Sequence, residues 1–274
     1  MSYVEVKDLG FRYPDGTEAL SGVSFSLEEG EMMSLIGQNG SGKTTLSKCL
    51  NGLLMPSSGS VVVDGHNSRS TRIAEMVRRV GYVFQNPDHQ LFNATCREEI
   101  AYGPKNIELP QEEIEVRVEE AARVVGLAEE YLEEHPFFLT KGLRQRVAIA
   151  AILALRPRVI IVDEPTTGQD ARQAVEIMNF LTDLNRRLGH TIVIITHDMD
   201  IVARFTDRLL VMANGRLIAD GAPGEIFSNH AVMQEASIAP PQITRLASEL
   251  ADMGIRRDIL TLEQMIKVFS EAGD

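Results

Sequence analysis

A glycine-rich segment, Gly37–Thr45, carries the clearest chemical signal in the sequence. It reads GQNGSGKTT, matches the pattern GxxxxGK[ST], and lies between an apolar run at 32–36 and a helix-forming stretch. Its glycines let the backbone approach phosphate oxygens, so that successive N–H groups at a helix N-terminus can donate to them. The lysine would neutralise charge on the β- and γ-phosphates, and the first threonine would bind Mg²⁺. The predicted triphosphate-binding residues are Gly37, Gln38, Asn39, Gly40, Ser41, Gly42, Lys43, Thr44 and Thr45.

Two adjacent carboxylates, Asp163 and Glu164, follow an apolar run at 159–162. This run predicts a strand buried on both faces, which would deliver the carboxylates to the edge of a sheet beside the phosphate loop. Asp163 would hold Mg²⁺ through water, and Glu164 would orient or polarise the attacking water. The alternative is that both residues only cap the next helix, but neighbouring carboxylates repel one another unless a cation offsets them.

Two further polar residues end predicted strands, His197 after the run at 191–195 and Gln85 after the run at 81–84. Because ligands bind at the carboxyl ends of parallel strands, we expect both near Asp163. His197 would contact the γ-phosphate, with a purely structural histidine as the alternative, and Gln85 would reach Mg²⁺ or the attacking water. The predicted catalytic residues are Lys43, Gln85, Glu164 and His197, and the predicted Mg²⁺ ligands are Thr44, Gln85 and Asp163.

Short strands alternate with helices over the first 230 residues, which predicts an α/β fold with a parallel sheet. The expected strands are 3–6, 22–27, 32–36, 61–63, 81–84, 159–162 and 191–195, with an Asn-Gly hairpin joining 208–212 to 216–219. The expected helices are 44–53, 71–78, 111–125, 143–155 and 170–188. Two amphipathic stretches, 242–253 and 262–269, predict a small helical extension over residues 231–274.

The composition excludes several classes of protein. Among 274 residues, 27 are basic and 39 acidic, and the net charge of −12 argues against binding a nucleic-acid backbone or an anionic lipid surface. The two cysteines, Cys49 and Cys96, are far apart and lack a CxxC pair, so free buried thiols are expected. The N-terminal segment has no signal-peptide pattern, and the longest apolar run, 147–155, is far shorter than the roughly 20 residues that cross a bilayer. Any membrane role would therefore depend on a partner.

The order of these motifs over residues 1–230 resembles that of the nucleotide-binding subunits of ABC transporters. The resemblance implies a P-loop NTPase core with a parallel sheet, an N-terminal antiparallel β subdomain and a helical subdomain at about 87–155. It also implies that Tyr13 stacks on adenine and that Asp170 is the aspartate of the D-loop, at 166–170. The implied reaction is hydrolysis of ATP to ADP and phosphate with Mg²⁺. In the family, two chains meet face to face, and each ATP lies between one chain's phosphate loop and the other chain's signature loop.

Residues 80–92 and 99–104 narrow the resemblance to the ATPase subunits of energy-coupling-factor importers, which serve vitamins and metal ions such as cobalt and nickel. This resemblance implies a transmembrane coupling protein that docks near Gln85–Phe92 and, through it, a substrate-binding membrane subunit. An acidic groove that includes Asp88 would suit an arginine-bearing helix of the coupling protein. The implied location is the cytoplasmic face of the cell membrane, with attachment through the partner.

The signature loop departs from the family's LSGGQ, because its core is Thr140, Lys141, Gly142 and Leu143. Thr140 keeps a hydroxyl and Gly142 keeps a close backbone approach, whereas Lys141 replaces a glycine and Leu143 replaces a polar residue. Since the phosphate loop and Glu164 are intact, we expect a heterodimer in which the ATP site that uses this signature loop turns over slowly. The alternative is a homodimer whose signature loops work normally.

Two other function classes fit less well. A soluble ATPase of the ABC type that acts on DNA would carry a long coiled coil between Lys43 and Asp163, which are only 120 positions apart in this sequence. One that acts on the ribosome would carry two ATPase units and basic linkers, whereas this sequence has one unit and a net charge of −12. A nucleotide-binding scaffold without turnover stays open.

Overall fold

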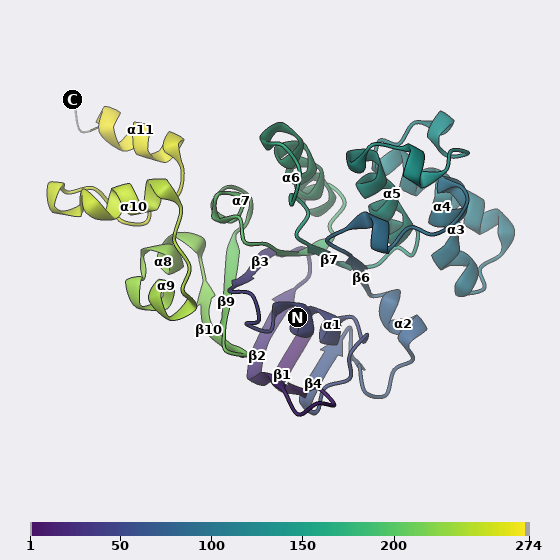
Figure 1. Ribbon diagram of the computed structural model, residues 1–274, viewed down its shortest axis with the longest axis horizontal. Helices are drawn as coiled ribbons and strands as arrows, with labels where there is room; N and C mark the ends of the chain where they lie inside the picture. The colour runs from purple at the N-terminus through teal and green to yellow at the C-terminus, as the bar shows by residue number, and fades with distance from the viewer. Residues whose placement is uncertain (1, 272–274) are drawn as a thin grey trace.

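A six-stranded sheet forms the centre of the molecule in the computed structural model, which describes residues 2–271 (Figure 1). The strand order is β10-β9-β3-β8-β7-β6, and only the β9–β10 pair is antiparallel. The strands are β3 (Met32–Gly37), β6 (Val80–Val83), β7 (Val159–Asp163), β8 (Thr191–Ile195), β9 (Arg208–Ala213) and β10 (Arg216–Gly221). The parallel strands are buried on both faces, as their continuous apolar runs predict.

An antiparallel sheet and one helix cover one face of this parallel sheet (Figure 1). The sheet has the order β2-β1-β4-β5, with β1 (Ser2–Arg12), β2 (Glu18–Glu28), β4 (Ser58–Val63) and β5 (His66–Asn67), and the helix is α1 (Lys43–Leu50). Alternate side chains of the parallel strands, such as Ile161 and Val193, share a core with Leu27 of β2 and Leu46 of α1. This arrangement brings the phosphate loop, which joins β3 to α1, to the carboxyl edge of the parallel sheet.

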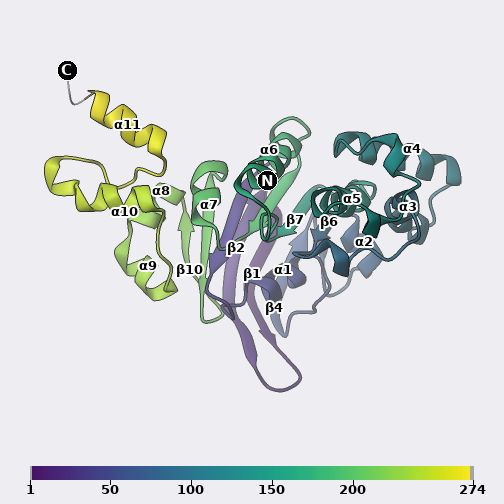
Figure 2. The same ribbon diagram turned by 45° about the horizontal axis from the view of Figure 1, so that its top comes forward.

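Helices cover the opposite face, where Ile160, Val162 and Ile194 pack beneath them. They are α3 (Cys96–Asn106), α4 (Gln111–Val124), α5 (Lys141–Leu153), α6 (Ala171–Arg186) and α7 (Met199–Phe205), while α2 (Ile73–Val77) lies against the edge strand β6. Short 3-10 turns lie at η1 (Pro87–His89), η2 (Glu129–Tyr131) and η3 (Pro136–Phe138). Helices α3 to α5 lie together at one end in both views (Figure 2). The structure confirms the predicted α/β fold.

The C-terminal helices divide between two small cores. Helices α8 (Pro223–Ser228) and α9 (His230–Ala236) pack on β9 through Phe227 and Met233. Helices α10 (Gln242–Glu249) and α11 (Leu262–Glu271), with the 3-10 turn η4 (Ala251–Met253) between them, share a separate cluster around Ala247 and Met265. These last helices lie at the end of the molecule opposite α3–α5 (Figure 2). The predicted division at residue 230 stays a prediction, and residues 272–274 of the predicted extension lie outside the described residues.

Cys49 and Cys96 are both buried and free, as predicted. Among residues 2–271, no helix combines the length and the apolar character needed to traverse a bilayer.

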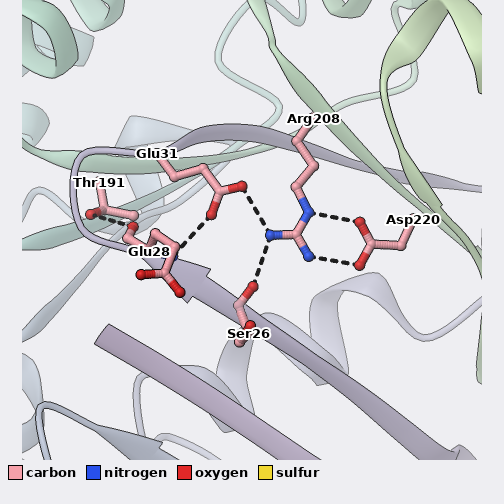
Figure 3. Close-up of polar contacts among 6 residues, drawn as sticks. All are labelled: Ser26, Glu28, Glu31, Thr191, Arg208 and Asp220. Atoms are coloured by element: carbon pink, nitrogen blue, oxygen red, sulfur yellow. Dashed lines mark hydrogen bonds and ion pairs between the residues drawn. The ribbon is translucent and has the colours of Figure 1, made fainter. Parts of the chain in front are cut away.

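Arg208, the first residue of β9, ties the two sheets together at the amino ends of the parallel strands (Figure 3). Its guanidinium donates twice to the Asp220 carboxylate, both at 2.7 Å, and once each to Glu31 Oε1 and the Ser26 carbonyl oxygen, both at 2.9 Å. Hydrogen bonding to Asp220, and then to Glu31, raises the pKa of Arg208. The side chain is 23% exposed, so these bonds are only partly screened by water.

Replacing Arg208 with methionine is expected to lower the free energy of unfolding by about 2–3 kcal/mol, because it leaves two carboxylates and a carbonyl without their donor. Urea unfolding followed by circular dichroism measures this change. Arg256 offers a matched control, since it forms an ion pair with Asp258 at 2.6 Å but its side chain is 75% exposed. Arg256→Met should leave the unfolding midpoint unchanged, and an equal loss in both variants would contradict the role given to Arg208.

Candidate active site

A cavity of about 910 Å³ lies at the carboxyl edge of the parallel sheet. Its walls contain thirteen of the predicted site residues: Tyr13, Gly37, Gln38, Asn39, Gly40, Gly42, Lys43, Thr44, Thr45, Gln85, Asp163, Glu164 and His197. Ser41 is buried within the loop, where its N–H donates to the Gln38 carbonyl oxygen at 3.1 Å. The structure therefore brings the predicted phosphate, metal and water-activating residues together around one space.

The phosphate loop is held closed by its own lysine. Lys43 Nζ donates to the carbonyl oxygens of Gly37 at 2.7 Å and Gln38 at 2.9 Å. Gly37 must be glycine, because a Cβ there would lie 2.4 Å from the Met212 carbonyl oxygen. Burial lowers the pKa of Lys43, and the nearby carboxylates of Glu164 and Asp163 oppose that effect. The loop thus surrounds a partly desolvated cation at the N-terminus of α1, an arrangement suited to phosphate oxygens.

Asp163 is fixed by a tyrosine on the neighbouring strand. Tyr82 Oη donates to Asp163 Oδ2 at 2.7 Å and accepts from Ser47 Oγ at 3.4 Å. Burial raises the pKa of Asp163, whereas the Tyr82 hydrogen bond and the charge of Lys43 lower it. The cavity thus contains three side-chain oxygen atoms that can bind a metal, one each from Thr44, Gln85 and Asp163 on three separate segments. This set of hard oxygen ligands fits a Mg²⁺ ion.

Replacing Tyr82 with phenylalanine removes the hydroxyl that orients Asp163 but keeps the ring in the core. We expect the Mg²⁺ concentration for half-maximal ATP hydrolysis to rise about tenfold, since residues that orient metal ligands typically contribute that much to metal affinity. A Mg²⁺ titration of ATPase activity, paired with calorimetric Mg²⁺ binding in the presence of ADP, measures the effect. Phe84→Leu is the control, because Phe84 directly follows β6 and its ring packs against that of Tyr82. An equal or larger increase in the Mg²⁺ requirement of Phe84→Leu would contradict the role given to the Tyr82 hydroxyl.

Glu164 has a strained backbone and a firmly held carboxylate. Its φ is +49°, a left-handed backbone conformation that residues other than glycine rarely adopt. Its N–H donates to the Ile195 carbonyl oxygen at 2.8 Å. Oε1 lies 2.8 Å from His197 Nδ1, and Oε2 accepts from Thr167 Oγ1 at 3.1 Å. The Glu164 side chain is 12% exposed and that of His197 is 70% exposed. The structure therefore orients Glu164 toward the cavity from two sides, as a residue that positions water requires.

Tyr13 lies in the wall of the same cavity, half-buried, with its ring edge against Phe11. Its hydroxyl is 3.0 Å from Thr45 Oγ1, so the ring is anchored to the first turns of α1. This position is compatible with stacking on a base whose phosphates occupy the loop. The adenine contact stays a prediction.

The signature residues lie apart from this cavity, around a second one of about 360 Å³ that Thr140, Gly142 and Leu143 help to line. Thr140 caps α5 by accepting from the Leu143 N–H at 3.4 Å, and Asp170 caps α6 by accepting from the Gln173 N–H at 2.8 Å. Because none of the signature residues lines the cavity around this chain's own phosphate loop, a role for them in ATP binding would require a second chain. The roles of these residues and of Asp170 stay predictions.

The segment after Gln85 contains an unexpected internal ion pair. The acidic groove was expected to offer Asp88 to a partner's arginine, but Asp88 Oδ1 lies 2.7 Å from Arg144 Nε of α5. Arg144 also donates to the Leu139 carbonyl oxygen at 2.8 Å. The segment also exposes an aromatic ring, since Phe92 is 63% exposed and packs edge-on against Tyr102 with 4.8 Å between the ring centroids.

Several residues that hold or line the site were not predicted from the sequence. Tyr82 and Thr167 hold the two carboxylates, and residues 237–239 line the cavity, where Gln38 Nε2 donates to the Ser237 carbonyl oxygen at 3.4 Å. A tyrosine hydroxyl inside a predicted buried strand needs a partner, and this would have pointed to Tyr82. The segment at 237–239 carries no such local signal.

Known proteins share this sequence and this arrangement. Residues 20–167 match the profile of the ABC transporter family. The energy-coupling factor transporter ATP-binding protein EcfA of Methanocaldococcus jannaschii is 45% identical over 248 residues, which cover 90% of this chain and 88% of the relative. The EcfA of Methanothermobacter thermautotrophicus is 42% identical over 264 residues, covering 95% and 84%.

Solved structures agree with the sequence matches. The structure of cbiO1 from Clostridium perfringens, described as part of the ABC transporter complex cbiONQ, superposes with a TM-score of 0.76 at 37% identity, covering 92% of this chain and 99% of that one. The ATP-binding cassette MJ0796, described as a dimer bound to ADP and Pi, gives a TM-score of 0.71 at 29% identity, covering 80% and 98%. The chain therefore belongs to the ABC transporter family and is one of its ATPases.

Proposed function

We propose that this chain is the ATP-hydrolysing subunit of an importer of the energy-coupling-factor type, which takes up a metal ion or a vitamin. The observation that carries this proposal is the cavity in which Lys43, Asp163 and Glu164 meet, in a chain 45% identical to a protein named as such a subunit. The similarity to cbiO1, part of a transporter complex, supports the same assignment.

The residues divide the work of hydrolysis between charge and position. Lys43 and the N–H groups of the loop bind the β- and γ-phosphates, and His197 contacts the γ-phosphate from the other side. Glu164, held by His197 and Thr167, orients the attacking water and accepts its proton. Thr44, Gln85 and Asp163 would hold Mg²⁺, which when bound supplies neutralising charge to the phosphates. No covalent intermediate with the protein is required.

We also propose that the working unit is a face-to-face dimer, in which the second chain's signature loop completes the site built on Lys43. The dimeric form described for MJ0796 supports this arrangement. Because Lys141 and Leu143 alter this chain's signature, we propose a heterodimer in which the site that uses this loop binds ATP but turns over slowly. Robust ATPase activity from the purified chain as a homodimer would contradict the proposed heterodimer, but it would not contradict the assignment of the chain as an ATPase.

The segment Gln85–Phe92 is the proposed docking site for a transmembrane coupling protein, through which the chain would attach to the cytoplasmic face of the membrane. The exposed Phe92 ring supplies an apolar contact, and its pairing with Tyr102 links the segment to α3. The Asp88–Arg144 pair links the same segment to α5 and hence to the signature loop. Movement at the docking site would thereby reach both helices.

Reconstitution with the membrane proteins encoded beside this chain tests the function. Proteoliposomes with ATP inside are expected to show ATP hydrolysis and cargo uptake together, and Glu164→Gln in this chain should stop both. ATP hydrolysis that proceeds without any association with those proteins would favour a soluble ATPase. Nucleotide binding without hydrolysis in every assembly would favour a scaffold.

A further inference from the structure

Lys141 joins two loops that the proposed function assigns to different ATP sites. It is the first residue of α5, and its Nζ donates to the Thr167 carbonyl oxygen at 2.9 Å. Thr167 lies three residues after Glu164, in the loop that follows β7. The bond therefore connects the signature loop, which serves the partner's ATP, to the loop that holds this chain's own water-activating carboxylate.

From Thr167 the connection continues to that carboxylate. Thr167 Oγ1 donates to Glu164 Oε2 at 3.1 Å, and the Thr167 N–H donates to the Glu164 carbonyl oxygen at 3.2 Å. The other carboxylate oxygen lies 2.8 Å from His197 Nδ1. A displacement of the Thr167 backbone would therefore turn the Glu164 carboxylate about its contact with His197.

Helix electrostatics alone do not explain a lysine at this position. A cation at the first residue of a helix faces the positive end of the helix dipole, and the first turn of α5 contains no acidic residue. The other cation in that turn, Arg144, is already paired with Asp88. Gly168 leaves the space that the ammonium occupies, because a Cβ there would lie 2.5 Å from Lys141 Nζ. Lys141 is thus packed into the loop after β7 and is not a solvated surface lysine.

We propose that Lys141 is a positioning residue that couples the two ATP sites of the dimer. The proposal rests on the proposed function, which places the partner's ATP at the N-terminus of α5. The Lys141 ammonium has three N–H donors, and the Thr167 carbonyl oxygen accepts from one of them. The γ-phosphate of the partner's ATP can therefore accept from another. Binding of the partner's ATP then shifts Lys141, Thr167 and finally Glu164. Occupancy of the partner's ATP site thereby sets the position of Glu164, the base in this chain's own ATP site.

The test uses an assembled dimer in which the partner's own catalytic glutamate has been changed to glutamine. Only the site built from this chain's Lys43 and Glu164 then turns over, and its signature loop comes from the partner, so Lys141 touches no part of its ATP. In that dimer Lys141→Met is expected to lower kcat roughly tenfold, with the KM for ATP unchanged within about twofold. Lys141→Arg keeps a cationic donor and should restore most of the loss.

Two further variants separate coupling from general damage. Thr167→Val removes the hydroxyl that contacts Glu164, and it should add little to the effect of Lys141→Met, because both act on the same chain of contacts. Lys105→Ala removes an exposed lysine from α3 and should leave kcat unchanged. An unchanged kcat in Lys141→Met, or an equal loss in Lys105→Ala, would overturn the coupling role. Absence of hydrolysis before any change at Lys141 would instead overturn the proposed function.

Discussion

Replacing Glu164 with glutamine is expected to reduce ATP hydrolysis at least about a hundredfold, the loss typical of removing a positioned general base. The amide keeps the size of the side chain and can still contact Thr167, but it cannot accept a proton from water. ATP affinity should be retained or increased, because a negative charge beside the γ-phosphate is removed while Lys43 is untouched. Phosphate release and equilibrium ATP binding measure the two quantities on the same sample.

The same variant should trap the ATP-bound dimer, which size-exclusion chromatography with and without ATP detects. Glu133→Gln is a matched control, because Glu133 pairs with Arg97 on the surface and its side chain is 68% exposed. It should leave turnover unchanged. Full activity in Glu164→Gln would exclude Glu164 as the base and would leave its strained backbone and its two hydrogen bonds without a catalytic reason.

Replacing Lys43 with alanine is expected to lower kcat/KM by at least about a hundredfold, because charge-assisted contacts to phosphate oxygens are lost in a partly desolvated site. The loop also loses the bonds from Nζ to the Gly37 and Gln38 carbonyl oxygens, which hold it closed. Steady-state phosphate release across a range of ATP concentrations measures the change. Both kcat and KM should worsen, since the same cation serves binding and the transition state.

Lys105→Ala provides the control for loss of one lysine charge, and it should change kcat/KM less than twofold if the effect of Lys43 is local. Thermal melts of both variants separate loss of folding from loss of function. A Lys43→Ala protein that melts as the wild type does and hydrolyses ATP at the wild-type rate would place the phosphate site elsewhere.

The sheet and most of the site could be predicted because their signals are local. Continuous apolar runs identified β7 and β8, and polar residues at their ends identified Glu164 and His197. Parallel strands bring their carboxyl ends to one edge, so sequence order alone placed these side chains near the phosphate loop. The structure places these side chains around a single cavity.

Other features depend on contacts between distant segments. Helix α3 was not predicted, since Gly103 and Pro104 are poor helix formers, and it forms because Thr95 caps it and Ile100 enters the core. Helices α8 and α9 were also not predicted as separate elements, and their apolar side chains are buried against residues of β3, α7 and β9. A pattern within one segment cannot reveal such packing.

The signature loop shows the same limit. Comparison with LSGGQ singled out Lys141 as a departure and predicted a weakened site, but no local pattern indicated that its ammonium would reach the carbonyl oxygen of Thr167. The ion pair between Asp88 and Arg144 likewise joins two separate segments, and it occupies a charge that was expected to serve a partner. Both contacts depend on how α5 lies against the rest of the chain.

Equilibrium binding of a fluorescent ATP analogue in the presence of Mg²⁺ tests the central claim most directly. The wild-type protein is expected to bind the analogue saturably, with one site per chain, and unlabelled ATP should displace it. Lys43→Ala should lose that binding while Lys105→Ala keeps it. Absence of saturable binding by the wild type, or identical binding by Lys43→Ala, would contradict the assignment of Gly37–Thr45 as the loop that holds the triphosphate.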